Sequence, residues 1–279
     1  EECERLQKAF GYTYEDVRTT ILPMAVKGGE GISSMGIDVP LAVLSDKRQP
    51  LFGYFKQLFA QVTNPPIDAI REKVVTSTTV YLGKDGNLLE EKAENCRMLK
   101  VNNPILTDTD LLKIKTMKQD GYQVAVIPTT YYKNSNLETM MDYLFVQVDK
   151  AINEGANILI LSDRGVDEFH VAIPSLLAVS GVQQHLVRTK KRTAVGIIIE
   201  TGEPKAVHEF ATLLGYGACA VNPYLAYASI HQLIEDDMLQ KDYYAAVEAY
   251  SNGILAGVVK IASKMGISTI QSYQGAQIF

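Results

Sequence analysis

A helix followed by a short apolar strand occurs four times in the second half of this 279-residue chain. The strands show no alternation of polar and apolar residues, so both of their faces are expected to be buried, as in a parallel sheet covered by helices. The repeat therefore predicts an α/β fold built from βα units around a parallel sheet. The helices are expected over 108–120, 136–154, 172–188 and 203–214, and the strands over 123–127, 157–162, 194–200 and 218–221.

The segments on either side of this repeat follow other patterns. After the repeat, the sequence predicts helices over 224–235 and 240–265 and an extended tail over 267–279. Gly253 and Gly257 weaken the longer helix by about 1 kcal/mol each, unless another element packs closely against them. Residues 83–107 follow no regular pattern. Before the repeat we expect a helix from Tyr14 capped by Thr13, a strand over 40–44, helices over 50–62 and 67–74, and a β-rich segment over 76–82.

Charge and apolar runs exclude several kinds of partner. The chain has 27 Lys and Arg against 32 Asp and Glu, a net charge of −5, so it offers no general basic field for nucleic acid. Its longest apolar stretches, such as 158–161, are too short to cross a bilayer, and no membrane association is expected. Three cysteines without a Cys-x-x-Cys pair, and no secretory signal, predict a reducing cytoplasm.

The two ends are unusual for natural termini. The chain begins at Glu1 without an initiator Met and ends on the apolar pair Ile278 and Phe279. Removal of a tag or tail is one explanation. The other is that both ends were cut from a longer polypeptide.

Charged side chains follow two of the predicted strands at their carboxyl ends, where parallel α/β folds bind ligands. Asp163 and Arg164 follow one strand, and Glu200 and Glu203 end the next. Asp163 in this position would orient Arg164 toward a small anionic ligand. The alternative is that Asp163 and Glu203 cap the following helices and that Arg164 pairs with one of them.

The remaining motifs do not complete a catalytic or metal site. The glycine-rich loop over 28–36 follows a helix, has Ser34 where a dinucleotide fingerprint needs glycine, and lacks the Lys-Ser or Lys-Thr pair of a Walker loop. The four histidines are never three or four residues apart, so no local metal site is expected. The residues alone thus predict an α/β protein without a complete catalytic constellation.

Several runs of sequence have a distinctive character: 31–46 (GISSMGIDVPLAVLSD), 54–68 (YFKQLFAQVTNPPID), 160–165 (ILSDRG), 200–204 (ETGEP), 214–218 (LGYGA), 221–226 (VNPYLA) and 263–279 (SKMGISTIQSYQGAQIF). In this order, and over nearly the whole chain, they resemble the glutamate synthase central domain. The match is looser over 83–130.

The resemblance implies a multidomain enzyme that makes two glutamates from glutamine and 2-oxoglutarate. An amidotransferase domain releases ammonia, an internal channel carries it, and an FMN domain with an iron–sulfur cluster completes the reaction. Electrons would come from a small NAD(P)H-dependent subunit or from ferredoxin. The family's central domain is expected to resemble a rudimentary or incomplete TIM-type barrel, here over 1–230, with a helical connector to the FMN domain over 231–279.

No catalytic, cofactor-binding or metal residue is carried over to this chain by the resemblance, and the isolated chain is expected to be inactive. What it suggests is contact with the catalytic domains and a share in the ammonia channel, through small polar residues in glycine and proline loops. The alternative is a free-standing α/β enzyme or binding module that uses Asp163, Arg164, Glu200 and Glu203 for a small anion. The channel candidates are Ser33, Ser34, Met35, Gly36, Asp38, Asn64, Pro65 and Pro66.

Overall fold

The computed structural model describes residues 1–31, 43–46, 49–57, 64–276 and 278–279, which form two compact units. The sheet unit comprises Thr79–Thr201 and Tyr216–Asn222, and the helical unit comprises Glu1–Thr78, Gly202–Gly215 and Pro223–Phe279. Each unit is described by itself below. The division into residues 1–230 and 231–279 stays a prediction.

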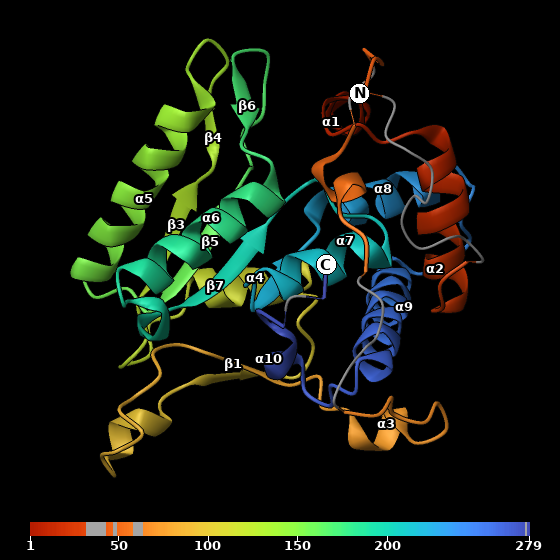
Figure 1. Ribbon diagram of the computed structural model, residues 1–279. Helices are drawn as coiled ribbons and strands as arrows, with labels where there is room; N and C mark the ends of the chain where they lie inside the picture. Colours follow the sequence, from red (N-terminus) through yellow and green to blue (C-terminus); the bar gives the residue numbers. More distant parts are fainter. Residues whose placement is uncertain (32–42, 47–48, 58–63, 277) are drawn as a thin grey trace. The chain divides into compact units, whose positions relative to one another are not determined.

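The sheet unit contains four parallel strands in the order in which they occur along the chain (Figure 1). This sequential order differs from that of a doubly wound sheet, in which the strand order reverses, and it is the order that an incomplete barrel has. The expected α/β class with repeated βα units and a parallel sheet is confirmed. The strands are β3 (Val124–Pro128), β5 (Ile158–Ser162), β7 (Gly196–Glu200) and β8 (Ala220–Asn222), and the helices of this unit are α4 (Asp108–Lys115), α5 (Leu137–Asn153) and α6 (Ser175–Arg188).

Helix α4 covers one face of this sheet. Its Leu111 and Ile114 are buried in one cluster with Ile160 of β5, Ile198 of β7 and Ala220 of β8. These three strand residues are paired in register, so they point to the same face. Helices α5 and α6 contact β3 and β7 respectively. Every residue of β5, β7 and β8 is buried, which explains why these strands show no polar alternation, whereas β3 is partly exposed, with Val126 at 47%.

A short extended segment continues the sheet beyond β8 and leads directly into α4. Val221 N–H donates to Pro104 O and Leu106 N–H donates to Val221 O, both at 2.8 Å. Thr107 then begins the helix, because its side-chain oxygen accepts a hydrogen bond from Asp110 N–H at 3.1 Å. The helix on this face is thus tied to the far edge of the sheet at its first turn.

Of the strands in two small antiparallel ribbons of the sheet unit, only β1 (Val80–Leu82) falls in a segment predicted to be β-rich, 76–82, and neither pairing was predicted. One ribbon pairs β1 with β2 (Leu99–Val101), and the other pairs β4 (Thr130–Tyr132) with β6 (His170–Ala172). The helix expected from residue 172 begins instead at Ser175, because Pro174 restricts the residue before it to an extended conformation. Three-residue strands give too short an alternation to be recognised. Short 3₁₀ turns complete this unit at Ala93–Cys96 and Arg192–Ala194.

The helical unit contains the remaining helices, of which the two longest described ones match the prediction closely. The helix predicted from Tyr14 is a π-helix followed by an α-helix, and its cap is confirmed: Thr13 and Asp16 exchange hydrogen bonds at 2.9 and 3.0 Å. The helices are α1 (Glu2–Ala9), the π-helix η1 (Asp16–Ile21), α2 (Leu22–Lys27), the 3₁₀ turn η2 (Leu51–Tyr54), α3 (Glu72–Val75), α7 (Val207–Gly215), α8 (Tyr224–Glu235), α9 (Tyr243–Lys264) and α10 (Ile270–Tyr273).

Two predictions near the N-terminus were wrong where the structure describes them. The helix expected over 50–62 is a single 3₁₀ turn, after which Phe55 is extended, and residues 58–62 lie outside the described part. Of the strand expected over 40–44, only Val43 and Leu44 are described, and both lie in an exposed turn. The apolar residues have suitable spacing, but neither element formed. Short segments adopt helix or strand only when the rest of the protein packs against them, because their own propensity is too weak. The short helix α10 lies in the tail predicted to be extended.

Another element packs closely against each of the two glycines in α9, which is the arrangement under which they were expected to be tolerated. A Cβ at Gly257 would lie 2.5 Å from Val207 Cγ2 of α7, and a Cβ at Gly253 would lie 3.3 Å from the backbone of Gly28 and Gly29. Both glycines therefore permit close packing against another element.

Candidate functional site

The carboxyl ends of β5 and β7 bring together the polar residues that the sequence singled out, and Glu200 is at their centre. Its side chain is 2% exposed. Oε2 accepts hydrogen bonds from Lys115 Nζ and from Ser162 Oγ, each at 2.7 Å. Oε1 accepts one from Arg164 Nε at 2.5 Å. Both carboxylate oxygens are therefore engaged by side chains of the sheet unit itself.

Arg164 and Asn222 connect this centre to the first turn of α4. The guanidinium of Arg164 also forms an ion pair with Asp108, with 3.8 Å between Nη2 and Oδ1. Asn222, which is fully buried at the end of β8, donates from Nδ2 to the same Asp108 oxygen at 2.9 Å and to Leu106 O at 3.1 Å. Three strand ends and one helix thus share a single polar cluster.

Asp163 takes part in a second buried contact at the same edge. It is 1% exposed, and its Oδ2 accepts a hydrogen bond from Thr201 Oγ1 at 2.5 Å. It does not cap a helix, because β6 follows it and α6 begins only at Ser175. Arg164 pairs with Glu200 and Asp108 rather than with a helix cap. Glu203 belongs to the helical unit and is buried there.

The charges of this cluster neutralise one another. Burial by itself raises the pKa of Glu200, but the hydrogen bonds from Lys115, Ser162 and Arg164, with the positive charge of Arg164, outweigh it and hold the pKa below its ordinary value. Glu200 is therefore a carboxylate at neutral pH. An anion would have to displace it from two cations and would meet Asp108 as well, so the arrangement favours structure over anion binding.

Lys115 and Asp108 are members of this cluster that sequence reasoning missed. Both lie on α4, more than 80 residues before Glu200 in the chain. Only the packing of α4 on the sheet brings them to the strand ends. The N-cap at Thr107 marked the start of the helix, but nothing in its sequence indicated which face of the sheet it would cover.

The channel candidates fall partly outside the described residues. Ser33, Ser34, Met35, Gly36 and Asp38 lie there, and only Asn64, Pro65 and Pro66 are described. All three of the latter are exposed.

The loop of these three residues is attached to the end of α9. Ile67 N–H donates to Ser263 O at 2.8 Å, and the backbone of Gly266, at φ +71°, lies against the loop. A Cβ at Gly266 would be 2.8 Å from Asn64 Cβ and 2.9 Å from Pro65 O. The loop is therefore exposed but fixed at its base.

Replacing Gly266 by alanine is expected to lower the free energy of unfolding by about 2 to 3 kcal/mol, because the left-handed φ costs about 1 kcal/mol and the loop must also move. Urea unfolding measures it. Gly275→Ala is the matched control, since Gly275 has φ +72° and no atom within 4 Å of its Cβ position. Equal losses in the two variants would contradict the contact between Gly266 and the loop.

The residues do not fit the FMN or the iron–sulfur cluster that the resemblance implies for a longer polypeptide. A four-thiolate iron–sulfur cluster needs more cysteines than the three present, and Cys219 is buried with Sγ 4.0 Å from Arg192 Nη2. A flavin phosphate at the strand ends would face the carboxylates of Asp108 and Glu200. In the part of the chain that the structure describes, there is no group of three His, Cys, Asp or Glu side chains placed to hold a metal ion, and no helix is both long and apolar enough to span a membrane.

Comparisons with known proteins agree on one family. The family description "Glutamate synthase central domain" matches residues 5–279. The chain is 51% identical over 273 residues to the glutamate synthase [NADPH] large chain of Bacillus subtilis, and 45% identical over 289 residues to ferredoxin-dependent glutamate synthase 2 of Synechocystis, each covering 98% of this chain. It is 41% identical over 283 residues to glutamate synthase [NADH] of Schizosaccharomyces pombe, covering 99% of this chain.

The chain spans 18% of the length of the first two relatives and 13% of the third. Among solved structures, it is similar to the recombinant flavin-binding domain of baker's yeast flavocytochrome b2, with a TM-score of 0.38 and 17% identity over 61% of this chain and 37% of that one. The match of the family description to almost every residue, with relatives up to 51% identical, shows that the chain belongs to the glutamate synthase central domain family.

Proposed function

We propose that the chain is the connecting domain of a glutamate synthase, which as a whole converts glutamine and 2-oxoglutarate into two glutamates. The chain would join the amidotransferase domain to the FMN domain of the same polypeptide. Its membership of the family and its small share of the length of its relatives support this. The reaction would be an oxidoreduction carried out by residues outside this chain.

The self-neutralised cluster around Glu200 is the observation that carries this proposal. The strand ends of a parallel α/β sheet are where ligands are normally bound. Here the carboxylate of Glu200 already accepts hydrogen bonds from Lys115, Arg164 and Ser162 of the same chain. The polar groups at the carboxyl ends of the strands thus bind one another instead of a ligand. A sheet of this kind is suited to holding other domains in position.

The FMN and the iron–sulfur cluster would be held by other parts of the polypeptide. The electron donor would be a small NAD(P)H-dependent subunit or ferredoxin, since relatives are named as NADPH, NADH and ferredoxin-dependent enzymes. A cytoplasmic location goes with this proposal.

The second part of the proposal is a share in the ammonia channel. Ser33, Ser34, Met35, Gly36, Asp38, Asn64, Pro65 and Pro66 would face the catalytic domains. The exposure of Asn64, Pro65 and Pro66 and the fixed base of their loop support a contact role for that segment. Small polar side chains pass a neutral polar molecule without holding it tightly.

Ser34→Phe in the complete polypeptide tests this role. The bulky ring is expected to raise the ratio of glutamine hydrolysed to glutamate formed several-fold, because ammonia is lost before it reaches the second site. The ratio is measured by assaying ammonia release and glutamate formation in parallel. Ser34→Ala, which adds no bulk, serves as the control and should keep the ratio of the natural enzyme. Equal loss of both activities, or an unchanged ratio in the phenylalanine variant, would contradict the channel role.

A further inference from the structure

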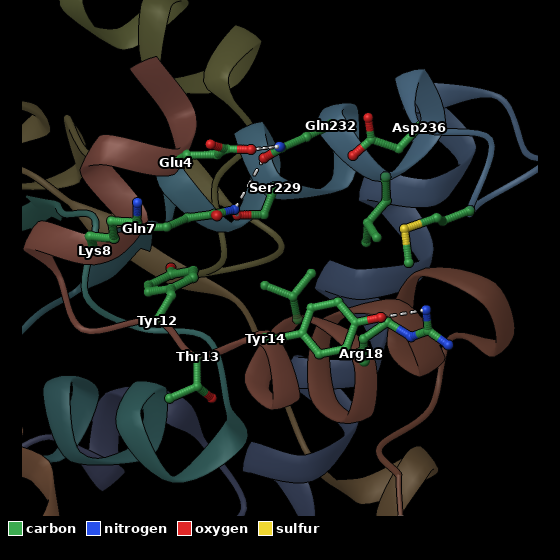
Figure 2. Close-up of a pocket in the computed structure, with 13 residues that line it drawn as sticks. Glu4, Gln7, Lys8, Tyr12, Thr13, Tyr14, Arg18, Ser229, Gln232 and Asp236 are labelled. Carbon is green, nitrogen blue, oxygen red and sulfur yellow. Dashed lines mark hydrogen bonds between the residues drawn. The ribbon is translucent and has the colours of Figure 1, made fainter. Parts of the chain in front are cut away.

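A pocket of about 340 Å³ lies in the helical unit, between α1, η1 and α8. Its volume is within the usual range for small-molecule sites. Figure 2 shows side chains from both ends of the sequence of this unit converging on it. The family description and the relatives assign nothing to it.

Charged groups of opposite sign stand on different sides of this pocket. Arg18 and Tyr14 line one side, whereas Asp236 and Glu4 line the other (Figure 2). With Lys8, the lining contains two positive and two negative side chains, so its formal charge is balanced. Such a lining favours a ligand that carries both charges over one that carries only one kind.

The guanidinium of Arg18 is held in a defined position. Arg18 Nη1 donates to the Tyr14 hydroxyl at 2.9 Å, and its guanidinium carbon lies 5.4 Å from the centre of that ring. Arg18 is on the π-helix η1, and single π-helical turns are frequent at functional sites. Within the described residues, neither Arg18 nor Asp236 forms an ion pair with another side chain. Both charges are thus available to a ligand.

Amide and hydroxyl groups also line the pocket, near Glu4. Gln7 Nε2 donates to Ser229 Oγ at 2.9 Å, and Ser229 is fully buried. Gln232 Nε2 lies 3.4 Å from Glu4 Oε1, and Gln7 Nε2 lies 3.4 Å from Gln232 Oε1. The two 3.4 Å contacts are long, which leaves the Gln232 amide able to turn toward a polar ligand group, whereas the shorter bond to Ser229 holds the Gln7 amide in place at the pocket.

We propose that this pocket binds a small zwitterion, an α-amino acid with a polar side chain. Arg18 binds the carboxylate, Asp236 binds the ammonium group, and the amides of Gln7 and Gln232 bind the side chain. Guanidinium and carboxylate groups form strong charge-assisted hydrogen bonds, so the two rims fix the direction of the ligand. The site does not depend on the channel role proposed above.

Titration calorimetry of the 279-residue chain tests the site, and the absence of the other domains removes competing glutamine sites. L-glutamine is expected to bind saturably. 2-Oxoglutarate, which has no ammonium group, and putrescine, which has no carboxylate, are expected to bind at least about tenfold more weakly, because each leaves one rim charge unpaired. Equal affinity for the three compounds, or no saturable binding of glutamine, would overturn the proposal.

Variants then place the ligand in this pocket. Arg18→Met and Asp236→Asn should each weaken glutamine binding about tenfold or more, while circular dichroism shows that the chain stays folded. Arg5→Met and Asp237→Asn are matched controls, since each removes the same charge from a residue on or next to the same helices that does not line the pocket. Unchanged affinity in both pocket variants would show that the ligand binds elsewhere and would refute the assignment.

Discussion

Replacing Glu200 by alanine is expected to lower the free energy of unfolding by about 2 to 4 kcal/mol. The change leaves Lys115 and Arg164 without their shared carboxylate, and removing one partner of a buried pair typically costs about 3 to 5 kcal/mol. The lower range applies because the side chain of Arg164 is 49% exposed and can be hydrated. Urea unfolding followed by circular dichroism measures the loss.

Two further variants separate the ion-pair contribution from simple truncation. Glu154→Ala removes a carboxylate from a surface pair, with 3.9 Å between Lys150 Nζ and Glu154 Oε1, and should change stability by less than about 0.5 kcal/mol. Combining Glu200→Ala with Lys115→Met should cost less than the sum of the single changes, because the second change removes the stranded cation. Strictly additive losses would show that Lys115 and Glu200 do not interact in solution.

The same residue gives a pH dependence with a definite sign. The pKa of Glu200 is lowered in the folded chain, so its stabilisation is complete above its unfolded pKa of about 4.3 and is lost as the pH falls through the folded value. The difference in unfolding free energy between the natural chain and Glu200→Gln should therefore shrink below about pH 4. A difference that stays constant from pH 7 to pH 3 would contradict a lowered pKa.

Gly257→Ala is expected to destabilise the chain by about 1 to 2 kcal/mol, although alanine in a helix interior is normally the better residue by about 1 kcal/mol. The sign is reversed because the new Cβ would lie 2.5 and 2.7 Å from the two γ-carbons of Val207, which is fully buried. Overpacking of this kind usually costs about 1 to 3 kcal/mol. Thermal or urea unfolding measures the effect.

A second substitution tests the cause. In a Val207→Ala background the clashing carbons are gone, so Gly257→Ala should become neutral or stabilising. Asn252→Ala, at an exposed position of the same helix, should gain a few tenths of a kcal/mol from helix propensity alone. If Gly257→Ala stabilises the natural chain as Asn252→Ala does, α7 and α9 do not pack as closely as described.

Periodicity identified the elements that are long or wholly apolar. The helix α8 was predicted at its observed bounds, and the four parallel strands were found to within two residues of their ends. In most of these elements many residues contribute to one pattern, and the three-residue β8 was recognised because it is the fourth strand of the helix–strand repeat. The ribbons β1–β2 and β4–β6 have three residues per strand, and their pairing depends on chain brought together by the rest of the unit. Their local sequence holds too few alternations to reveal this.

The candidate site was predicted only as far as sequence order fixes it. Parallel strands place their carboxyl ends together, so Arg164 and Glu200 were expected to be neighbours. The structure confirms this, with 2.5 Å between Arg164 Nε and Glu200 Oε1. Their role was not determined by that order. It depends on Lys115, whose helix covers one face of the sheet, and on the depth at which Glu200 is buried. The pocket beside Arg18 has no sequence signature, because its walls come from segments more than 200 residues apart.

The division of the chain into two units determines the order in which the units can fold during synthesis on the ribosome. Once residues 79–201 have left the ribosome, the sheet unit lacks only the segment Tyr216–Asn222, which carries β8. The helical unit can complete its folding only later, because its segments are more widely separated in the sequence. Its Ile21 and Met24 are fully buried in the finished chain, and their segment contacts α9, which is synthesised about 220 residues later. Because this contact forms only after α9 has been synthesised, the segment that carries Ile21 and Met24 stays without it throughout that interval, and it is the segment of this unit most in need of a chaperone.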